Sequence, residues 1–152
     1  MRNSYYNLIV KIEKIHRMFL DQLKSELESL KLRDVSNIQA SILYNIGTDE
    51  ININTLMERE YYLGSNVSYN MRKLTENGYV VQKNDLYDRR QTVVNLSQKG
   101  MELYKHLDKI FMNHQDLLIL TFMSEDNVRE VWDKLVSIEG FFNKISNNIK
   151  IK

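Results

Sequence analysis

The sequence predicts a mainly α-helical fold with one small β-hairpin. Three observations lead to this prediction: long amphipathic segments at both ends, a centre of short segments punctuated by glycine, and no proline among 152 residues. Proline is the usual breaker of helix interiors, so helices in this chain are free to run long. We therefore expect long helices at both ends, and a small mixed unit between them.

The first expected element is a helix from about Tyr5 to Leu32. Its apolar residues recur at steps of three and four, which places them on one helical face, and charged residues fill the opposite face. These apolar residues are Leu8, Ile12, Ile15, Phe19, Leu23, Leu27 and Leu30.

The centre of the chain, from about 36 to 96, divides into shorter elements. Ser36 and Gln39 form a capping-box pattern, which predicts a helix start, and Gly47 is expected to end that helix. A short helix is expected next, from about Asn54 to Glu60.

A further helix is expected from about Asn66 to Asn77, closed by Gly78. Two strand-like runs follow, Tyr79 to Lys83 and Thr92 to Leu96. The polar stretch between them is too long for a two-residue turn, so the hairpin should have an extended tip.

The last third of the chain returns to long helices. Ser124 is the expected N-cap of the final helix, because Glu125 and Asp126 suit the positive end of a helix dipole. The apolar stripes of the terminal helices exceed what a small central unit can cover, which indicates a partner. A homodimer built from both chain ends is the economical interpretation, and a monomeric helical bundle is the alternative. The expected dimer-interface residues are Leu8, Ile9, Ile12, Trp132, Phe141, Phe142, Ile145 and Ile149.

Composition excludes several classes of function. Hydrophobic residues make up 43% and charged residues 27%, which suits a globular protein rather than a disordered one. Without cysteine there can be no disulfides, thiolate metal ligands or thiol-based redox sensing. Neither a Gly-rich phosphate loop nor a nucleophile elbow is present, so we predict no enzyme, cofactor or metal site. Apolar runs are too short for a signal peptide or a membrane span, and we expect a cytoplasmic protein.

The central elements follow the order of a helix-turn-helix with a wing. In its second helix, Val67, Met71 and Leu74 should face the core. The other face carries hydrogen-bond donors and no carboxylate, which is what major-groove edges and phosphates require. A polar helix face alone is more often merely solvated, and it is the order and spacing of the elements that favour DNA. The residues expected to contact DNA here are Ser65, Asn66, Ser68, Tyr69, Asn70, Arg72 and Lys73.

The expected wing tip carries Asp88, Arg89 and Arg90. Two guanidiniums on an extended loop can reach a narrow minor groove, and the Asp88 carboxylate can grip and aim the Arg90 guanidinium. Bulk charge is only +1, from 21 basic and 20 acidic residues. From Leu63 to Ser97, however, five basic residues against three acidic ones give +2.

Three stretches resemble the MarR family of transcriptional regulators: Leu63 to Val80, Asp88 to Arg90, and Val94 to Gly100. They contain a Ser-x-Val-Ser recognition helix, a Leu-x-x-x-Gly-Tyr exit, an Asp-x-Arg wing and a Leu-Ser-x-x-Gly start of the next helix. The resemblance covers about 35–100, and the flanking helices fit the family's dimerisation arms.

The resemblance implies an obligate homodimer on a pseudo-palindromic duplex, which represses or otherwise regulates transcription. It places Ser65, Ser68, Tyr69 and Lys73 on the DNA face, and it makes Arg90 the minor-groove arginine with Asp88 as its support. It also implies a small aromatic or phenolic effector, for which we assign no site. Tyr69 and Asn70 stand where many relatives have arginine and an apolar residue, which puts the base preference in doubt.

The string from Asn66 to Asn70 is most similar to a branch that controls cell-wall L,D-transpeptidase genes. The implied organisation is a dimerisation helix at 1–34, a DNA-binding lobe at 35–97 and dimerisation helices at 98–152. A helical protein–protein adaptor, whose winged unit no longer binds DNA, is the alternative function.

Overall fold

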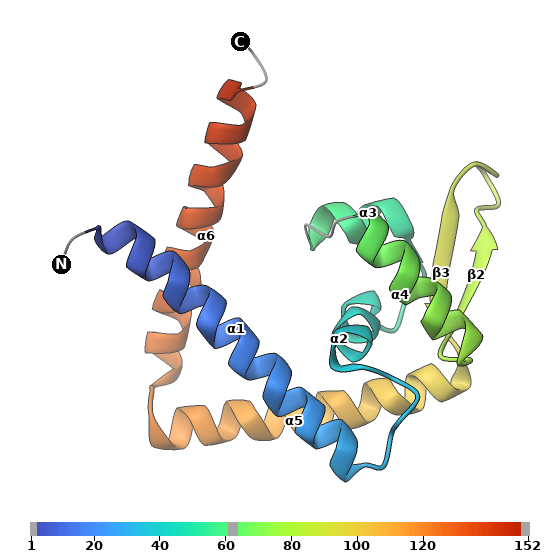
Figure 1. Ribbon diagram of the computed structural model, residues 1–152, viewed down its shortest axis with the longest axis horizontal. Coiled ribbons are helices and arrows are strands. Elements are labelled where there is room, and N and C mark those ends of the chain that lie inside the picture. The colour runs from blue at the N-terminus through green and yellow to red at the C-terminus, as the bar shows by residue number, and fades with distance from the viewer. Residues whose placement is uncertain (1–2, 61–63, 150–152) are drawn as a thin grey trace. The chain divides into compact units, whose positions relative to one another are not determined.

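The computed structural model describes residues 3–60 and 64–149, and within these ranges the chain forms six helices and one three-stranded sheet (Figure 1). In chain order the elements are α1 (Ser4–Ser29), α2 (Asn37–Ile46), β1 (Ile51–Asn52), α3 (Ile53–Arg59), α4 (Gly64–Glu76), β2 (Val80–Asn84), β3 (Thr92–Leu96), α5 (Gln98–Thr121) and α6 (Glu125–Ile149). Two compact units are present, Met1–Ile110 and Phe111–Lys152. The mainly helical fold with a hairpin wing is as the sequence predicts. None of the described helices has the length and apolar character needed to cross a membrane.

The start and end of α2 follow from two predicted signals. The Ser36 hydroxyl accepts a hydrogen bond from the Gln39 amide at 3.2 Å, and the Gln39 side chain accepts one from the Ser36 amide at 3.0 Å. This is the expected capping box. The helix ends at Gly47, whose φ of 78° lies in the left-handed region that favours glycine.

The end of α1 differs from the prediction. The helix ends at Ser29, and Lys31 adopts a φ of 58°. The Leu32 amide then donates to the Leu27 carbonyl at 3.0 Å, and the Lys31 amide donates to the Glu28 carbonyl at 2.9 Å. These two bonds form a Schellman motif, which usually depends on glycine. A lysine in that place gives no sequence signal, so the expected helix runs too far.

The sheet has the strand order β1-β3-β2, and both pairings are antiparallel. Strand β2 pairs with β3 in a register that aligns Val80 with Leu96 and Asn84 with Thr92. The β2–β3 hairpin is the predicted wing. The sequence does not predict β1, because a strand of two residues is too short to show a period-two pattern.

The core of the first unit lies between α2, α4 and the sheet. Val67, Met71 and Leu74 are buried on the inner face of α4, as expected. Figure 1 shows α4 beside the β2–β3 hairpin, with the loop between the strands extending beyond the helix. The side chain of Gln82 in β2 donates to the Thr75 hydroxyl at 2.7 Å, which connects the wing to α4.

Tyr79 joins the end of α4, the sheet and the start of α5. Its hydroxyl donates to Asp34 Oδ1 at 2.7 Å, and Lys99 Nζ donates to Asp34 Oδ2 at 2.6 Å while lying 4.1 Å from the Tyr79 ring centre. Burial opposes ionisation of Asp34, but the bonds from Lys99 and Tyr79 outweigh it and lower the pKa of Asp34. Burial, and then the bond to Asp34, raise the pKa of Tyr79.

The start of α5 lies directly against the Tyr79 backbone. The Ser97 hydroxyl donates to the Gly78 carbonyl at 2.6 Å and accepts from the Gly100 amide at 3.0 Å, as an N-cap does. A Cβ on Gly100 would lie 2.0 Å from the Tyr79 carbonyl oxygen. The Leu-Ser-x-x-Gly motif is therefore a packing requirement.

Gly100→Ala should destabilise the protein, because a methyl group would force apart two backbone segments. Overpacking of this kind costs about 1–3 kcal/mol, and the loss should appear as a lower midpoint in urea denaturation. Gly140→Ala is the matched control, since a Cβ there meets no atom of the described residues within 4 Å. In α6 it should be neutral, or stabilising by up to about 1 kcal/mol. Equal stability of Gly100→Ala and the wild type would contradict this account of the junction.

Candidate nucleic-acid interface

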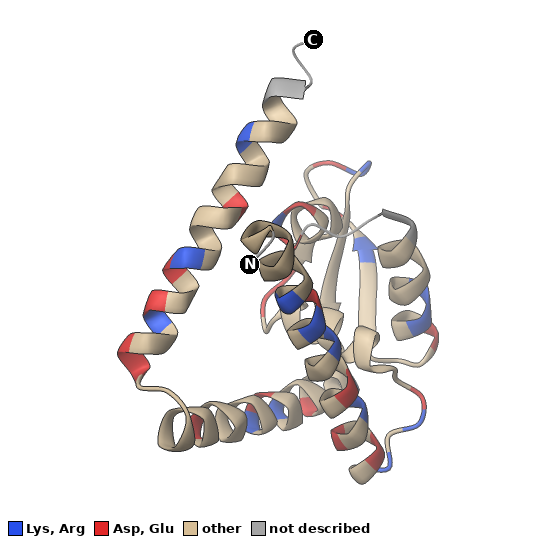
Figure 2. Cartoon of the chain, turned by 60° about the vertical axis from the view of Figure 1, so that its left-hand side comes forward, with Lys and Arg blue, Asp and Glu red and all other residues tan. Residues whose placement is uncertain are grey.

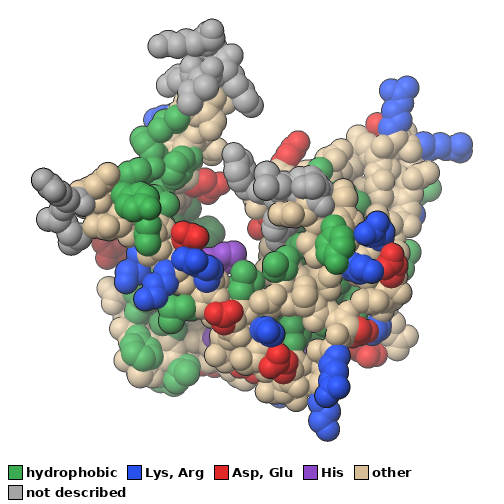
Figure 3. All heavy atoms as spheres, viewed as in Figure 1, with side chains coloured by type: hydrophobic (Ala, Val, Ile, Leu, Met, Phe, Trp, Pro, Cys, Tyr) green, Lys and Arg blue, Asp and Glu red, His purple; other side chains and the backbone are tan. Residues whose placement is uncertain are grey.

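Helix α4 presents an exposed stripe on the side away from its core residues. Tyr69, Arg72 and Lys73 lie on this stripe, and Asn66 and Ser68 are also exposed. Figure 3 shows basic, acidic and hydrophobic side chains gathered over α4. The structure thus exposes four of the predicted DNA-contacting residues of this helix, and the fifth, Lys73, is half-buried. The side chain of Ser65, which was also predicted to contact DNA, lies outside the described residues.

The expectation that Asn70 lies on the outward face is wrong. Its exposed fraction is 9%, and its Nδ2 donates to the Asn66 carbonyl at 2.8 Å. Asn70 follows Val67 by three residues and precedes Leu74 by four, so helical geometry places it on the core stripe. Its polar character hid this position from the sequence analysis, which read the core from apolar residues alone.

A carboxylate at the end of α4 holds both basic residues of the stripe. Glu76 Oε2 accepts from Lys73 Nζ at 2.8 Å, and Glu76 Oε1 lies 3.8 Å from Arg72 Nε. The bond from Lys73, together with the charges of Lys73 and Arg72, lowers the pKa of Glu76. Arg72 also lies 5.7 Å from the centre of the Tyr69 ring. Glu76 is one of the three acidic residues in the charge balance of this segment, but its place on the stripe was not predicted. Its spacing of three residues from Lys73 and four from Arg72 is the signal that indicates it.

The wing tip is fixed by bonds to backbone amides. Asp85 Oδ1 accepts from the amides of Tyr87 at 2.7 Å and Asp88 at 2.9 Å. The Asp85 amide donates to the Gln91 carbonyl, and the Gln91 amide donates to the Asp88 carbonyl, each at 2.9 Å. The backbone bonds from Asp88 and Tyr87 lower the pKa of Asp85. The tip is therefore an ordered turn, and Figure 2 shows its acidic and basic residues side by side.

Asp88 supports Arg90 in a different way from the one expected. Its Oδ1 accepts from the Arg90 backbone amide at 3.0 Å, and its Oδ2 accepts from Gln91 Nε2 at 3.2 Å. The predicted grip on the Arg90 guanidinium is not formed. Arg89 and Arg90 are exposed, and within residues 3–60 and 64–149 neither guanidinium lies within 4.0 Å of a carboxylate. Both charges are thus available to a partner.

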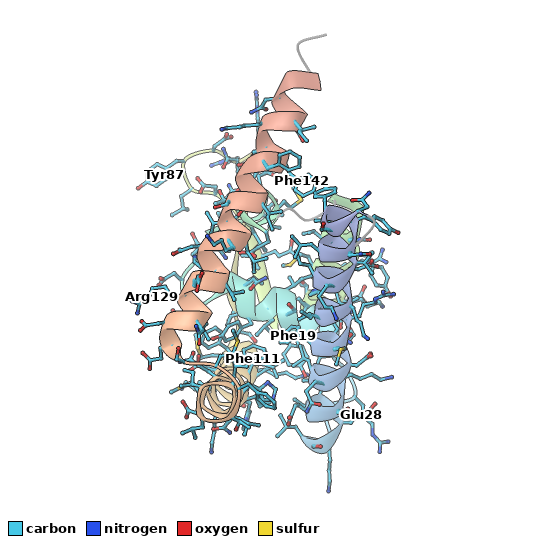
Figure 4. All side chains as sticks on the ribbon, turned by 90° about the vertical axis from the view of Figure 1, so that its left-hand side faces the viewer. Phe19, Glu28, Tyr87, Phe111, Arg129 and Phe142 are labelled. Carbon is cyan, nitrogen blue, oxygen red and sulfur yellow. The ribbon has the colours of Figure 1, made fainter. Side chains whose placement is uncertain are left out.

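Two apolar residues at the wing tip were not predicted to be part of the site. Leu86 is 86% exposed and Tyr87 is 98% exposed. Figure 4 shows Tyr87 pointing away from the rest of the chain. An apolar pair inside the otherwise polar stretch between the strands was the available signal.

A groove of about 380 Å³ runs along α4 next to β2. Its polar lining comes from Ser68, Arg72, Thr75, Glu76 and Gln82. Across the hairpin, Asn52, the N-cap of α3, donates through Nδ2 to Gln91 Oε1. Side chains from α3, α4 and the wing are thus joined into one connected surface.

The predicted dimer residues fall into two sets. On α1, Leu8 is exposed while Ile9 and Ile12 are half-buried. On α6, Trp132, Phe141, Phe142 and Ile145 are all exposed, with Trp132 at 66%. The side chain of Ile149 lies outside the described residues. Each set leaves large apolar side chains in solvent.

Among the described residues, no three His, Asp or Glu side chains form a group that could hold a metal ion. The fold and the surface together define a winged helix-turn-helix, which is a class of DNA-binding domain.

Comparison with known proteins agrees with this class. Residues 35–100 match the family described as winged helix DNA-binding domain. The exopolysaccharide II synthesis transcriptional activator ExpG of Rhizobium meliloti strain 1021 is 33% identical over 100 residues, which are 66% of this chain and 52% of ExpG. The chain thus spans about half the length of this curated relative.

Solved structures share the fold over most of the chain. A MarR transcriptional regulator from Methanosarcina mazei Go1 is 22% identical, with a TM-score of 0.75 over 92% of this chain and 99% of that one. Streptococcus pneumoniae FabT, crystallised in complex with DNA, is 19% identical, with a TM-score of 0.71 over 93% and 99%. Residues 35–100 thus match a winged helix DNA-binding family, and the chain has the fold of MarR-type transcriptional regulators. The predicted fold and the predicted resemblance to MarR-type regulators are confirmed, whereas the branch that controls L,D-transpeptidase genes stays a prediction.

Asp85 makes the order of the wing tip depend on pH. Its folded-state pKa is depressed, so its bonds are stable above the ordinary value of 3.8 and are lost as the pH falls through the folded value below it. The hydrogen-exchange protection of the Tyr87 and Asp88 amides should therefore fall at acid pH. Asp85→Ala should remove this protection at neutral pH as well.

The Leu43 amide, in the core of α2, is the internal control for global unfolding. It should remain protected in Asp85→Ala at neutral pH. If the wing-tip amides of Asp85→Ala were as protected as those of the wild type, Asp85 would not be what orders the turn.

Proposed function

We propose that this chain is a transcriptional regulator that binds duplex DNA as a homodimer on a pseudo-palindromic operator. The observation that carries the proposal is the outward surface of the winged helix domain. Its exposed α4 stripe supplies donors, and its ordered wing supplies two unpaired guanidiniums. ExpG is a transcriptional activator and FabT has been crystallised with DNA, which supports the proposal by similarity.

In this proposal α4 enters the major groove. Ser68 and Tyr69 would meet base edges or phosphates through their hydroxyls, and Arg72 and Lys73 would neutralise phosphates. Asn66 would contribute at the start of the helix, together with Ser65. Neutralised phosphates release counterions, so affinity should fall steeply as salt is raised.

The wing would enter the adjacent minor groove. A narrow minor groove has a strongly negative potential that attracts arginine. Arg90 is the proposed groove residue, with Arg89 beside it, because both guanidiniums are exposed on an ordered turn. Asp88 would act by fixing the backbone from which Arg90 extends.

Dimerisation would use the long helices outside the lobe at 35–97, in the segments 1–34 and 98–152. Exposed apolar stripes of this size usually mark an interface. The proposed contacts are Leu8, Ile9 and Ile12 on α1, and Trp132, Phe141, Phe142, Ile145 and Ile149 on α6. Two copies would then present their α4 helices at a spacing of about one DNA turn, roughly 34–36 Å.

Modulation by a small aromatic or phenolic effector is a further part of the proposal. The rings of Tyr44 in α2 and Tyr104 in α5 stack with centres 4.9 Å apart, and the Tyr44 hydroxyl donates to Asp108 at 2.9 Å. Burial, and then the bond to Asp108, raise the pKa of Tyr44 to about 12, so the hydroxyl stays protonated. An aromatic compound that displaced this pair would act on the link between α2 and α5.

Selection of bound duplexes from a random pool should yield a pseudo-palindrome with half-sites about one turn apart. On that duplex, Arg90→Ala should reduce affinity about tenfold or more, because a buried minor-groove guanidinium is lost. Its thermal unfolding should match the wild type, since the guanidinium makes no ion pair with any residue of 3–60 or 64–149.

Arg129→Ala is the charge-matched control for Arg90→Ala. Arg129 is exposed on α6 and lies outside the winged helix domain. It should leave affinity unchanged. If selection enriched no duplex, or if Arg90→Ala bound normally, the adaptor alternative would be favoured.

Trp132→Ala and Phe142→Ala should each weaken dimerisation. Aromatic residues at the centre of an interface often contribute about 2 kcal/mol or more, which is roughly a thirtyfold change in the dimer dissociation constant. Sedimentation velocity over a concentration series measures that constant. Figure 4 shows Arg129 and Phe142 on opposite sides of α6, so Arg129→Ala is the control for Phe142→Ala. A wild-type chain that sediments as a monomer at micromolar concentration would refute the proposed dimer.

A further inference from the structure

Glu76 is the one acidic residue of α4, and it lies on the same stripe as Arg72 and Lys73. We propose that Glu76 is an internal competitor of DNA phosphate that sets the overall affinity of the domain for duplex DNA. It occupies the two cations in the free protein, so phosphates must displace it. This inference rests on the proposed function, and it adds a residue that limits binding instead of promoting it.

The geometry of the three side chains supports a direct exchange. Glu76 Oε2 and Lys73 Nζ are 2.8 Å apart, which is a charge-assisted hydrogen bond of the kind a phosphate oxygen would make. Arg72 Nε reaches the other oxygen at 3.8 Å. Spacings of three and four residues bring these side chains together on the helix surface. The Glu76 carboxylate therefore occupies the position that a phosphate bound by Lys73 and Arg72 would take.

Glu76, Lys73 and Arg72 are all at least partly exposed, so their ion pairs can affect DNA binding without much effect on folding stability. The Glu76 side chain is 49% exposed, and those of Lys73 and Arg72 are 39% and 64% exposed. Ion pairs in solvent contribute little to folding stability. A carboxylate close to the DNA backbone, in contrast, repels it and reduces the positive charge of the stripe from +2 to +1.

The acidic residues of the wing are used differently. Asp85 and Asp88 accept bonds from backbone amides and pair with neither guanidinium of Arg89 and Arg90. Glu76 instead accepts from side chains that belong to the proposed interface. In the wing, Lys83 pairs with Glu50, but the two arginines of the tip lie within 4.0 Å of no carboxylate among the described residues. The charge of α4 is thus held by a competitor, whereas the charge of the wing tip is not.

Such a competitor should lower the affinity of the domain by the same factor for every DNA sequence. Non-specific affinity depends almost entirely on phosphate neutralisation, and it must stay weak because the genome offers many competing sites. Removing the carboxylate should strengthen phosphate contacts equally on any duplex. Base preference, which depends on groove edges, should not change.

Glu76→Gln tests the inference, because it keeps the size of the side chain and removes the charge. We expect affinity to rise roughly threefold to tenfold near 0.1 M salt, on the selected duplex and on a scrambled duplex of the same length alike. The slope of log affinity against log salt should steepen by about one unit. Thermal unfolding should match the wild type, which keeps folding effects apart from binding effects.

Two controls make the result specific. Glu102→Gln removes an exposed carboxylate from α5 and should leave both affinities unchanged. In the Lys73→Ala background, Glu76→Gln should have a smaller effect than in the wild type, because the main partner of Glu76 is gone.

Each contrary outcome has a definite meaning. Unchanged affinity of Glu76→Gln on both duplexes would overturn the inference and leave the proposed function intact. A loss of affinity on the selected duplex alone would also overturn it, since Glu76 would then be accepting a bond from a cytosine amino group. A wild-type protein that binds no duplex would instead refute the proposed function itself.

Discussion

The contact between the Tyr79 backbone and the start of α5 is the constraint on which the DNA-binding lobe depends. The Tyr79 carbonyl leaves no room for a Cβ at Gly100 and accepts a bond from the Ser97 amide at 3.0 Å. The Tyr79 hydroxyl donates a hydrogen bond to Asp34, and Asp34 also accepts one from Lys99. One residue thereby connects the loop after α1, the exit of α4, the first strand of the wing and the first turn of α5. Because backbone atoms are closely packed at this point, the end of α4 and the start of the wing have fixed positions.

Order at the far end of the wing has a separate cause. The tip is too exposed to be held by packing, and its conformation comes from Asp85 and Asp88, which accept backbone amide bonds. Such bonds order the chain without engaging the arginine side chains. A rigid support with free guanidiniums favours binding, because less conformational entropy is lost when the complex forms.

Patterns that follow directly from backbone geometry could be predicted from the sequence. The capping box at Ser36, the core stripe of α4 and both strands of the wing are of this kind, and the motif glycine at 100 proves to be a steric requirement. Features decided by tertiary context could not be predicted. Lys31, with its backbone in the left-handed region, follows the end of α1 where glycine is usual. Strand β1 has two residues and forms only by pairing with β3. Asn70 is polar and yet buried. The predicted grip of Asp88 on a guanidinium was chemically reasonable, but a backbone amide two residues away was the nearer donor.

The near-neutral charge of the chain is consistent with a DNA-binding surface once each acidic residue is assigned its partner. Counted as charges, Asp85, Asp88 and Glu76 all oppose the five basic residues of the segment from Leu63 to Ser97. Two of them, however, bond to backbone amides and so give the wing its shape. Only Glu76 pairs with cations of the α4 stripe. The net charge therefore understates the positive charge that the wing-tip arginines can offer to DNA. It overstates the positive charge that the α4 stripe can offer. Affinity for duplex DNA should accordingly depend on whether a carboxylate faces the backbone or a cationic side chain, more than on how many carboxylates the domain contains.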